Sequence, residues 1–155
     1  MRVKKLKELE SSNEVQSALD RLIEISKPNV DFAKMINDMA IIYKADNKKL
    51  EYYLSKFSAW MSYLADQVTR AEIVKIVAES QSSIIYSHCV EKAIGTINSR
   101  KEFARSDTLY LLALDVLNET KNIVRILQMQ YENAVRGYQL ASRIVALRLG
   151  IKEYN

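Results

Sequence analysis

The fold of this chain is decided by residues 100–149, which read RKEFARSDTLYLLALDVLNETKNIVRILQMQYENAVRGYQLASRIVALRL. The segment has no proline, and its one glycine, Gly137, lies far from both ends. Apolar and small residues recur in steps of three and four, which is the a/d spacing of a coiled coil. This first seam consists of Phe103, Ser106, Tyr110, Ala113, Leu117, Thr120, Val124, Leu127, Tyr131, Ala134, Tyr138, Ala141 and Val145.

A second apolar seam lies beside the first on the same segment. It consists of Leu109, Leu112, Val116, Ile123, Ile126, Leu140, Ile144 and Leu147. One partner helix cannot cover both seams, so the segment requires a helical bundle, and uncovered apolar surface favours self-association. We expect a homo-oligomer whose interface uses the second seam and an aromatic pair, namely Trp60, Phe57, Leu109, Leu112, Val116, Ile123, Leu140 and Ile144.

The composition favours few, long elements. Three glycines and one proline in 155 residues leave little turn chemistry, which argues against an all-β fold. The single cysteine, Cys89, excludes an intramolecular disulfide and fits a reducing compartment. No secretory signal pattern is visible, and no apolar run approaches the ~20 residues of a membrane span. We therefore expect a cytoplasmic protein that does not bind membranes.

Three helices are expected before residue 99. The first covers residues 3–25, with a polar gap at 10–14 where it is a candidate to break, and Pro28 follows its end. The second covers residues 31–43 and is capped by Asn29 or Asp31. The third covers residues 48–97, with Asp46 or Asn47 as its N-cap, an interruption of the pattern at 81–83 and Gly95 near its end.

The last helix is expected over residues 99–150. Ser99 and Glu102 have the spacing of a capping box at its start, and Gly150 is placed to cap its end. We predict a single all-α domain over residues 1–155. It is an elongated bundle built on a long antiparallel hairpin of residues 46–98 and 99–150, with two shorter helices in residues 1–45.

Catalytic and metal-binding patterns are absent from the sequence. His88 and Cys89 are adjacent, so on a helix they point about 100° apart, and no other histidine or cysteine could complete a zinc site. The carboxylates are spread along helices, as Glu72 is near Lys75, which is typical of solvated faces. There is no glycine-rich phosphate loop. We expect a non-enzymatic protein without a cofactor or a metal.

Basic residues gather towards the C-terminus. Residues 121–152 contain six cations, opposed only by Glu132 and, just beyond, Glu153. Arginine suits phosphate because its guanidinium donates two parallel hydrogen bonds. We expect nucleic-acid contacts from two clusters, namely Arg100, Lys101 and Arg105, and Lys121, Arg125, Arg136, Arg143 and Arg148. The alternative is an ordinary basic solvent face that stabilises helix ends through the helix dipole.

Three short motifs carry a resemblance to a known family. They are Phe57-Ser58-Ala59-Trp60 before a long helix, Lys101 with Ala104-Arg105-Ser106-Asp107, and the pair Ser142-Arg143. Their layout over residues 50–149 resembles the UvsY family of recombination mediators from T4-type phages. In that family an aromatic-Ser-x-Trp segment precedes a charged helix, and a Ser-Arg or Asn-Arg pair closes the last helix.

The resemblance implies a helical protein that forms a ring-like oligomer in an infected cell. It would bind single-stranded DNA and help a recombinase displace the single-strand-binding protein, and Arg143 would match the arginine of the family's terminal pair. The family has basic residues before a central tyrosine, but Gln81 and Ser83 precede Tyr86 here. Arg100, Lys101 and Arg105 are the cations that could take over this role. The alternatives are a structural or connector protein of a phage particle and a small helical inhibitor of a host protein.

Overall fold

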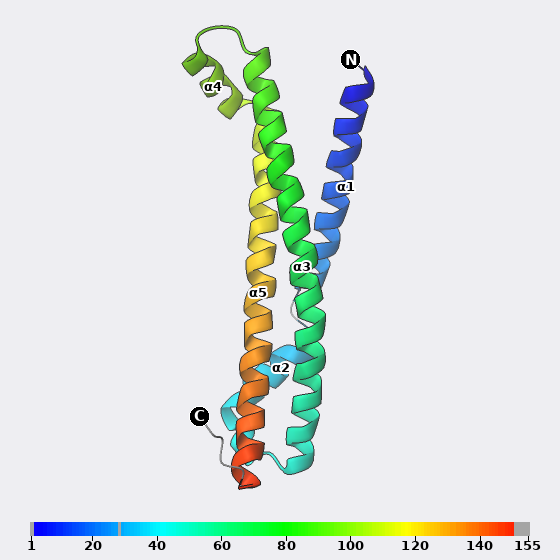
Figure 1. Ribbon diagram of the computed structural model, residues 1–155, viewed down its shortest axis with the longest axis vertical. Helices are drawn as coiled ribbons and strands as arrows, with labels where there is room; N and C mark the ends of the chain where they lie inside the picture. Colours follow the sequence, from blue (N-terminus) through cyan, green and yellow to red (C-terminus); the bar gives the residue numbers. More distant parts are fainter. Residues whose placement is uncertain (1, 28, 151–155) are drawn as a thin grey trace. The chain divides into compact units, whose positions relative to one another are not determined.

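The structure of the chain, a computed structural model, describes residues 2–27 and 29–150, with side chains from residue 14 onward. The regular elements in this part are all helical (Figure 1). They are α1 (Arg2–Ser26), α2 (Val30–Asp38), the 3-10 helix η1 (Met39–Lys44), α3 (Asn47–Lys92), α4 (Ile97–Ser106) and α5 (Thr108–Arg148). The predicted all-α fold is confirmed for these residues.

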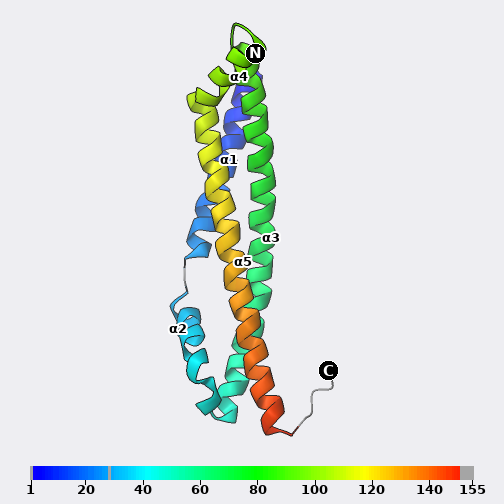
Figure 2. The ribbon, with the colours of Figure 1, turned by 90° about the vertical axis from the view of Figure 1, so that its left-hand side faces the viewer.

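The described chain packs as two compact units, each assembled from segments that are distant in sequence. The first unit combines residues 2–26 with 69–125, and the second combines residues 27–68 with 126–150. Both units contain a segment of α3 and a segment of α5, and in each the two segments run antiparallel (Figure 1, Figure 2). The antiparallel hairpin predicted from the seams is thus present in each unit.

The core of the first unit joins three helices. Val15 of α1, Ala78 of α3 and Leu117 of α5 form a buried cluster, with Val74 and Val116 packed against it. Further along, the rings of Tyr86 and Tyr110 lie 5.0 Å apart between centroids. Leu117, Thr120 and Val124 of the first seam are all buried. The first seam therefore faces the core here, as its spacing predicts.

The core of the second unit is built around Phe57 of α3. Its side chain is fully buried, and the ring of Phe32 from α2 meets it edge-on at 6.4 Å. Gly137 of α5 lies directly against the same ring, because a Cβ placed on it would be 2.5 Å from Phe57 Cζ. The predicted seam residue Tyr138 is instead 37% exposed. The inward position belongs to Gly137, which lets α5 approach the ring.

The upstream helices differ from expectation mainly at their ends. α1 continues without a break through residues 10–14, and α3 continues through residues 81–83. The second predicted helix ends early, since residues 39–44 form a 3-10 turn. Asn29 caps α2 through its side chain, and Asp46 caps α3 by accepting from the Lys49 amide at 2.7 Å. Both caps are among those predicted.

The single helix predicted over residues 99–150 is wrong, because Asp107 divides it into α4 and α5. Asp107 is extended at φ −68° and ψ 131°, and its Oδ1 accepts from the Leu109 amide at 2.8 Å. α4 also begins earlier than Ser99, with Thr96 as its N-cap. α3 correspondingly ends at Lys92, and Gly95 follows with φ +124°. Within the described chain, no helix is long and apolar enough to cross a membrane.

Candidate functional site

One stretch of α5 carries an excess of positive charge. Residues 121–148 hold five cationic side chains and one anionic side chain, Glu132. The other residues of the chain hold eighteen of each sign, so this stretch has an excess of four positive charges; residues 2–7, with four cations and no acid, have the same excess. A stretch with such an excess of cations attracts polyanions more strongly than a balanced stretch does.

Two predicted contact residues of the first unit are already engaged within it. Arg100 is half-buried, and its Nε donates to the Gly95 carbonyl at 3.0 Å, which secures the turn before α4. Lys121 Nζ lies 3.8 Å from Glu79 Oε1 in an ion pair between α5 and α3. Both side chains of that pair are about half exposed, so the pair is weak and can exchange partners.

Three other cations of the first unit face solvent. Lys101 and Arg105 lie on α4, and Arg125 lies on α5. Within the described chain, none of them has a hydrogen-bond or ion-pair partner. Their charges are therefore available to an external anion.

In the second unit, Arg136 and Arg143 project from the outer side of α5. Each follows a fully buried alanine, Ala134 or Ala141, by two residues, which places it on the opposite side of the helix. Arg136 Nη2 is 3.6 Å from Glu132 Oε2 in a pair whose side chains are 75% and 63% exposed. Arg143 is exposed and has no partner among the residues the structure describes.

Arg148 has a structural role that its sequence position did not predict. Its guanidinium donates to the carbonyls of Tyr43 at 2.9 Å and Ala45 at 2.7 Å, and to Asn47 Oδ1 at 3.1 Å. These acceptors belong to the end of η1, the turn after it and the start of α3. The fork of Arg148 thereby ties the end of α5 to this corner of the second unit.

The residues expected at a subunit interface fall into three groups. Phe57 and Ile123 are buried within the chain, so neither presents a surface to another subunit. Those that are partly covered are Trp60, Val116 and Ile144. Those that are exposed are Leu109 at 59%, Leu112 at 57% and Leu140 at 39%. The interface prediction thus places two core residues at the surface, because a seam alone does not tell which neighbour covers it.

An exposed aliphatic face lies on α3 in the first unit. Ile73, Ile76, Val77 and Ile84 are between 41% and 60% exposed. Ser80, Ser83 and Ser87 occupy the positions between and beyond them on the same side, so this face carries no charge over four turns. A contiguous exposed apolar face of this kind is a candidate protein-binding surface.

Two buried titratable groups of the described chain, Cys89 and Tyr53, have raised pKa values. Among the residues described, no three metal-ligating side chains cluster. The Cys89 thiol is buried, and burial, followed by the charge of Asp107 and its hydrogen bond, raises the pKa of this thiol. Tyr53 donates to Asp38 Oδ2 at 2.9 Å, and its pKa is raised by burial and by that hydrogen bond. Both groups thus favour their neutral, unreactive forms.

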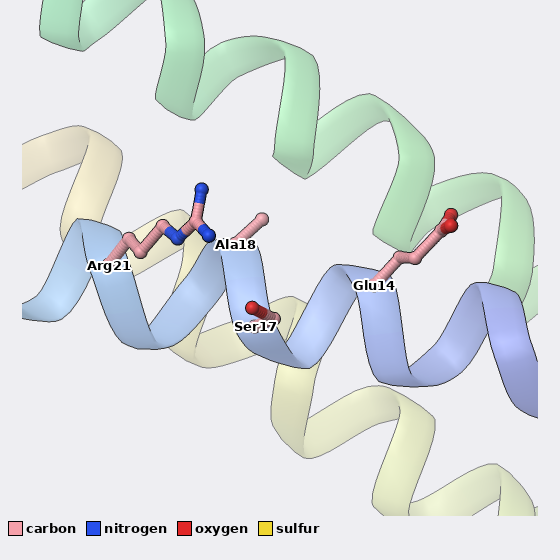
Figure 3. Close-up of a pocket in the computed structure, with 4 residues that line it drawn as sticks. All are labelled: Glu14, Ser17, Ala18 and Arg21. Carbon is pink, nitrogen blue, oxygen red and sulfur yellow. The ribbon is translucent and has the colours of Figure 1, made fainter.

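A groove beside α1 has a volume of about 380 Å³ and is lined by Glu14, Ser17, Ala18 and Arg21. Figure 3 shows that these side chains all come from α1, with Glu14 and Arg21 towards opposite ends of the groove. Two residues seven positions apart are about 10 Å apart along a helix, so these charges do not converge on one ligand atom. The groove therefore lacks the convergent polar groups of a small-molecule site.

No protein-family model, no curated protein and no solved structure matches this chain.

Proposed function

We propose that this protein is a non-enzymatic, self-associating helical protein that binds single-stranded DNA and acts as a recombination mediator of the UvsY type. The observation that carries the proposal is the excess of four positive charges on residues 121–148. Arg125 and Arg143 on that helix are exposed and without protein partners in the described chain. The family resemblance over residues 50–149 supplies the finer part, the assistance to a recombinase.

The proposed mechanism needs no chemistry on the DNA. The exposed arginines of α5 neutralise phosphates and release the cations condensed on the strand. Self-association repeats this cationic helix in every subunit, so weak single contacts add up along a strand. A strand held in this way is kept away from the single-strand-binding protein and is presented to the recombinase.

The DNA-binding part is tested by neutralising two arginines at constant helix propensity. Arg136→Gln with Arg143→Gln is compared with Lys34→Gln with Lys48→Gln, which removes two exposed lysines from the same unit. The readout is the fluorescence anisotropy of a labelled oligothymidine in a salt series beginning at about 50 mM. Because both variants lose the same charge, a larger loss in the arginine variant locates the contact on α5.

The slope of log affinity against log salt gives the number of phosphates contacted. Each contact on a single strand contributes about 0.7 to that slope, so the arginine variant is expected to lose about 1.4. Equal effects of the arginine and lysine variants would show attraction by net charge only. Absence of wild-type binding at the lowest salt would refute the function.

The mediator part has its own assay. A recombinase is added to a strand already covered by single-strand-binding protein, and the onset of its DNA-dependent ATPase activity is timed. The wild-type protein is expected to shorten the lag, and the arginine variant to shorten it less. An unchanged lag in the presence of clear DNA binding would leave a DNA-binding protein without the mediator role.

The exposed aliphatic face of α3 supports a second candidate, a structural component of a larger helical assembly. Ile73, Ile76 and Ile84 on this face would pack against protein. This candidate predicts self-association that is insensitive to oligonucleotide. Light scattering with and without oligothymidine separates the two functions.

A further inference from the structure

A stripe of lysines and aromatic residues runs along α3 in the second unit and was not predicted. Lys49, Tyr52, Lys56, Trp60 and Tyr63 follow one another in steps of three and four, so they lie along one side of the helix. Tyr52 is 53% exposed and Tyr63 is 44% exposed, while Trp60 is partly covered. The sequence shows this spacing of lysines and aromatic residues. It did not indicate a surface stripe, because aromatic residues at helical spacing usually belong to a core.

Packing beneath the stripe holds its aromatic rings in place. The ring of Phe32 from α2 lies 5.2 Å from that of Trp60, and Tyr63 meets Trp60 edge-on at 5.9 Å and 85°. Phe32 is itself buried, so Trp60 rests on the core rather than moving freely. The exposed ring of Tyr63 is therefore fixed at one end of a supported aromatic group.

Each cation of the stripe lies over a tyrosine ring of α3. Lys56 Nζ is 5.6 Å from the centroid of Tyr52 in the stripe, whereas Lys49 Nζ is 5.5 Å from that of Tyr53, which is buried and outside the stripe. Among the neighbouring acids, Asp38 is engaged by the Tyr53 hydroxyl. The exposed groups of the stripe are thus π-faces with ammonium groups close by, which is the combination that binds unstacked bases and their phosphates.

We infer that this stripe is a stacking platform for the bases of single-stranded nucleic acid, with Tyr52 and Tyr63 as the stacking residues and Lys49 and Lys56 as phosphate contacts. Tyr52 and Tyr63 are eleven residues apart, which is about 16 Å along the helix. A strand crossing this distance meets both rings. The inference rests on the proposed single-strand binding and adds a second contact. The platform stacks on the bases, whereas the arginines of α5 contact the phosphates.

The platform is tested with a strand that lacks its bases. The wild-type protein is expected to bind oligothymidine more tightly than an abasic strand of the same length and charge. Tyr52→Leu with Tyr63→Leu should lose about tenfold in affinity for oligothymidine per ring removed. The same variant should keep its affinity for the abasic strand and its salt slope, because no charge has changed.

Two further variants control this comparison. Tyr43→Leu removes another exposed tyrosine that also has a lysine beside its ring, Lys44, but lies on η1 outside the stripe. It should bind like the wild type. Tyr52→Phe with Tyr63→Phe keeps both rings and should retain the affinity for oligothymidine. If the leucine variant does not fold, the phenylalanine variant and the next measurement still decide the matter.

The chain carries one tryptophan, which is part of the stripe, so its emission reports on the platform directly. Oligothymidine should quench Trp60 emission in the wild-type protein, and the abasic strand should not. Anisotropy showing binding without quenching, or equal affinity of the leucine variant and the wild type, would overturn the platform and leave the arginine contacts intact. Loss of self-association in the leucine variant, with DNA affinity unchanged, would assign the stripe to a protein interface. Absence of any strand binding would end both proposals.

Discussion

At the scale of single residues, Gly137 determines how closely α5 approaches Phe57. Alanine in a helix interior is ordinarily more favourable than glycine by ~1 kcal/mol. Here the added methyl would lie 2.5 Å from Phe57 Cζ, and overpacking of a core costs about 1–3 kcal/mol. We expect Gly137→Ala to lower the urea concentration at the midpoint of unfolding. Circular dichroism measures this midpoint.

Phe57→Leu provides the matched test of this contact. In that background the ring is gone, so Gly137→Ala should become neutral or stabilising, and the two substitutions should be strongly non-additive. Additive effects would mean that the glycine is needed for another reason. The sequence indicated the seam around this position but placed Tyr138 inward, because a heptad pattern favours the larger apolar residue over a glycine.

Cys89 gives a prediction about pH. Burial is the largest of the causes that raise the pKa of the Cys89 thiol. The folded protein therefore holds the thiol proton more tightly than the unfolded chain does. The resulting stability is fully present at neutral pH and is lost as the pH rises beyond the ordinary thiol pKa, near 8.5. Alkylation by iodoacetamide, followed by mass spectrometry, should require a higher pH in the native protein than in urea. An identical pH profile in both would contradict the shift.

At the scale of elements, Asp107 separates α4 from α5 by capping the second. Asp107→Ala removes the acceptor of the Leu109 amide, and loss of such a cap costs about 0.5–2 kcal/mol. Hydrogen exchange should accelerate at the first amides of α5. Asp115→Ala, an exposed change inside the same helix, should leave exchange unaffected or slightly slower. Equal effects of both substitutions would argue against the cap.

The elements themselves were largely predictable, and their ends were less so. Periodicity predicted helical structure over most of residues 3–25, 48–97 and 99–150, because buried side chains must recur at the helical period, although the last of these segments is two helices. The break at Asp107 was not predicted, because one side-chain hydrogen bond outweighs a heptad pattern that continues across it. Asn29 and Asp46 were foreseeable, because a short polar side chain before an apolar run is a common helix start.

At the scale of the whole molecule, the uncovered face of α3 predicts self-association. Ile76→Glu with Ile84→Glu would bury charge in any interface formed there, so sedimentation velocity should show smaller species than for the wild type. Ile41→Glu, at another exposed isoleucine outside this face, serves as the control. Helix content should stay unchanged in both, because all three side chains are more than half exposed. An unaltered size distribution would remove this face from the interface.

The sequence could not reveal which apolar residues the chain covers by itself. The second seam predicted an exposed apolar surface. Ile123 is buried, however, whereas Leu109 and Leu112 are exposed. Burial depends on where α1 and α2 pack, and their short patterns carry no information about that. The arginines that we propose as DNA contacts were named from the sequence, whereas the exposed tyrosines of α3 were not, because spacing does not distinguish a ring in a core from a ring at a surface.

The interleaving of the two units has a consequence for how the chain is made. Residues 27–68 leave the ribosome early, but their partner segment on α5 begins only at residue 126. Translation proceeds at about 5–20 residues per second. Phe57 and its neighbours are therefore synthesised several seconds before the helix that covers them. A messenger RNA truncated before that point would yield a chain whose aromatic core is exposed. Chaperones and proteases would bind such a chain.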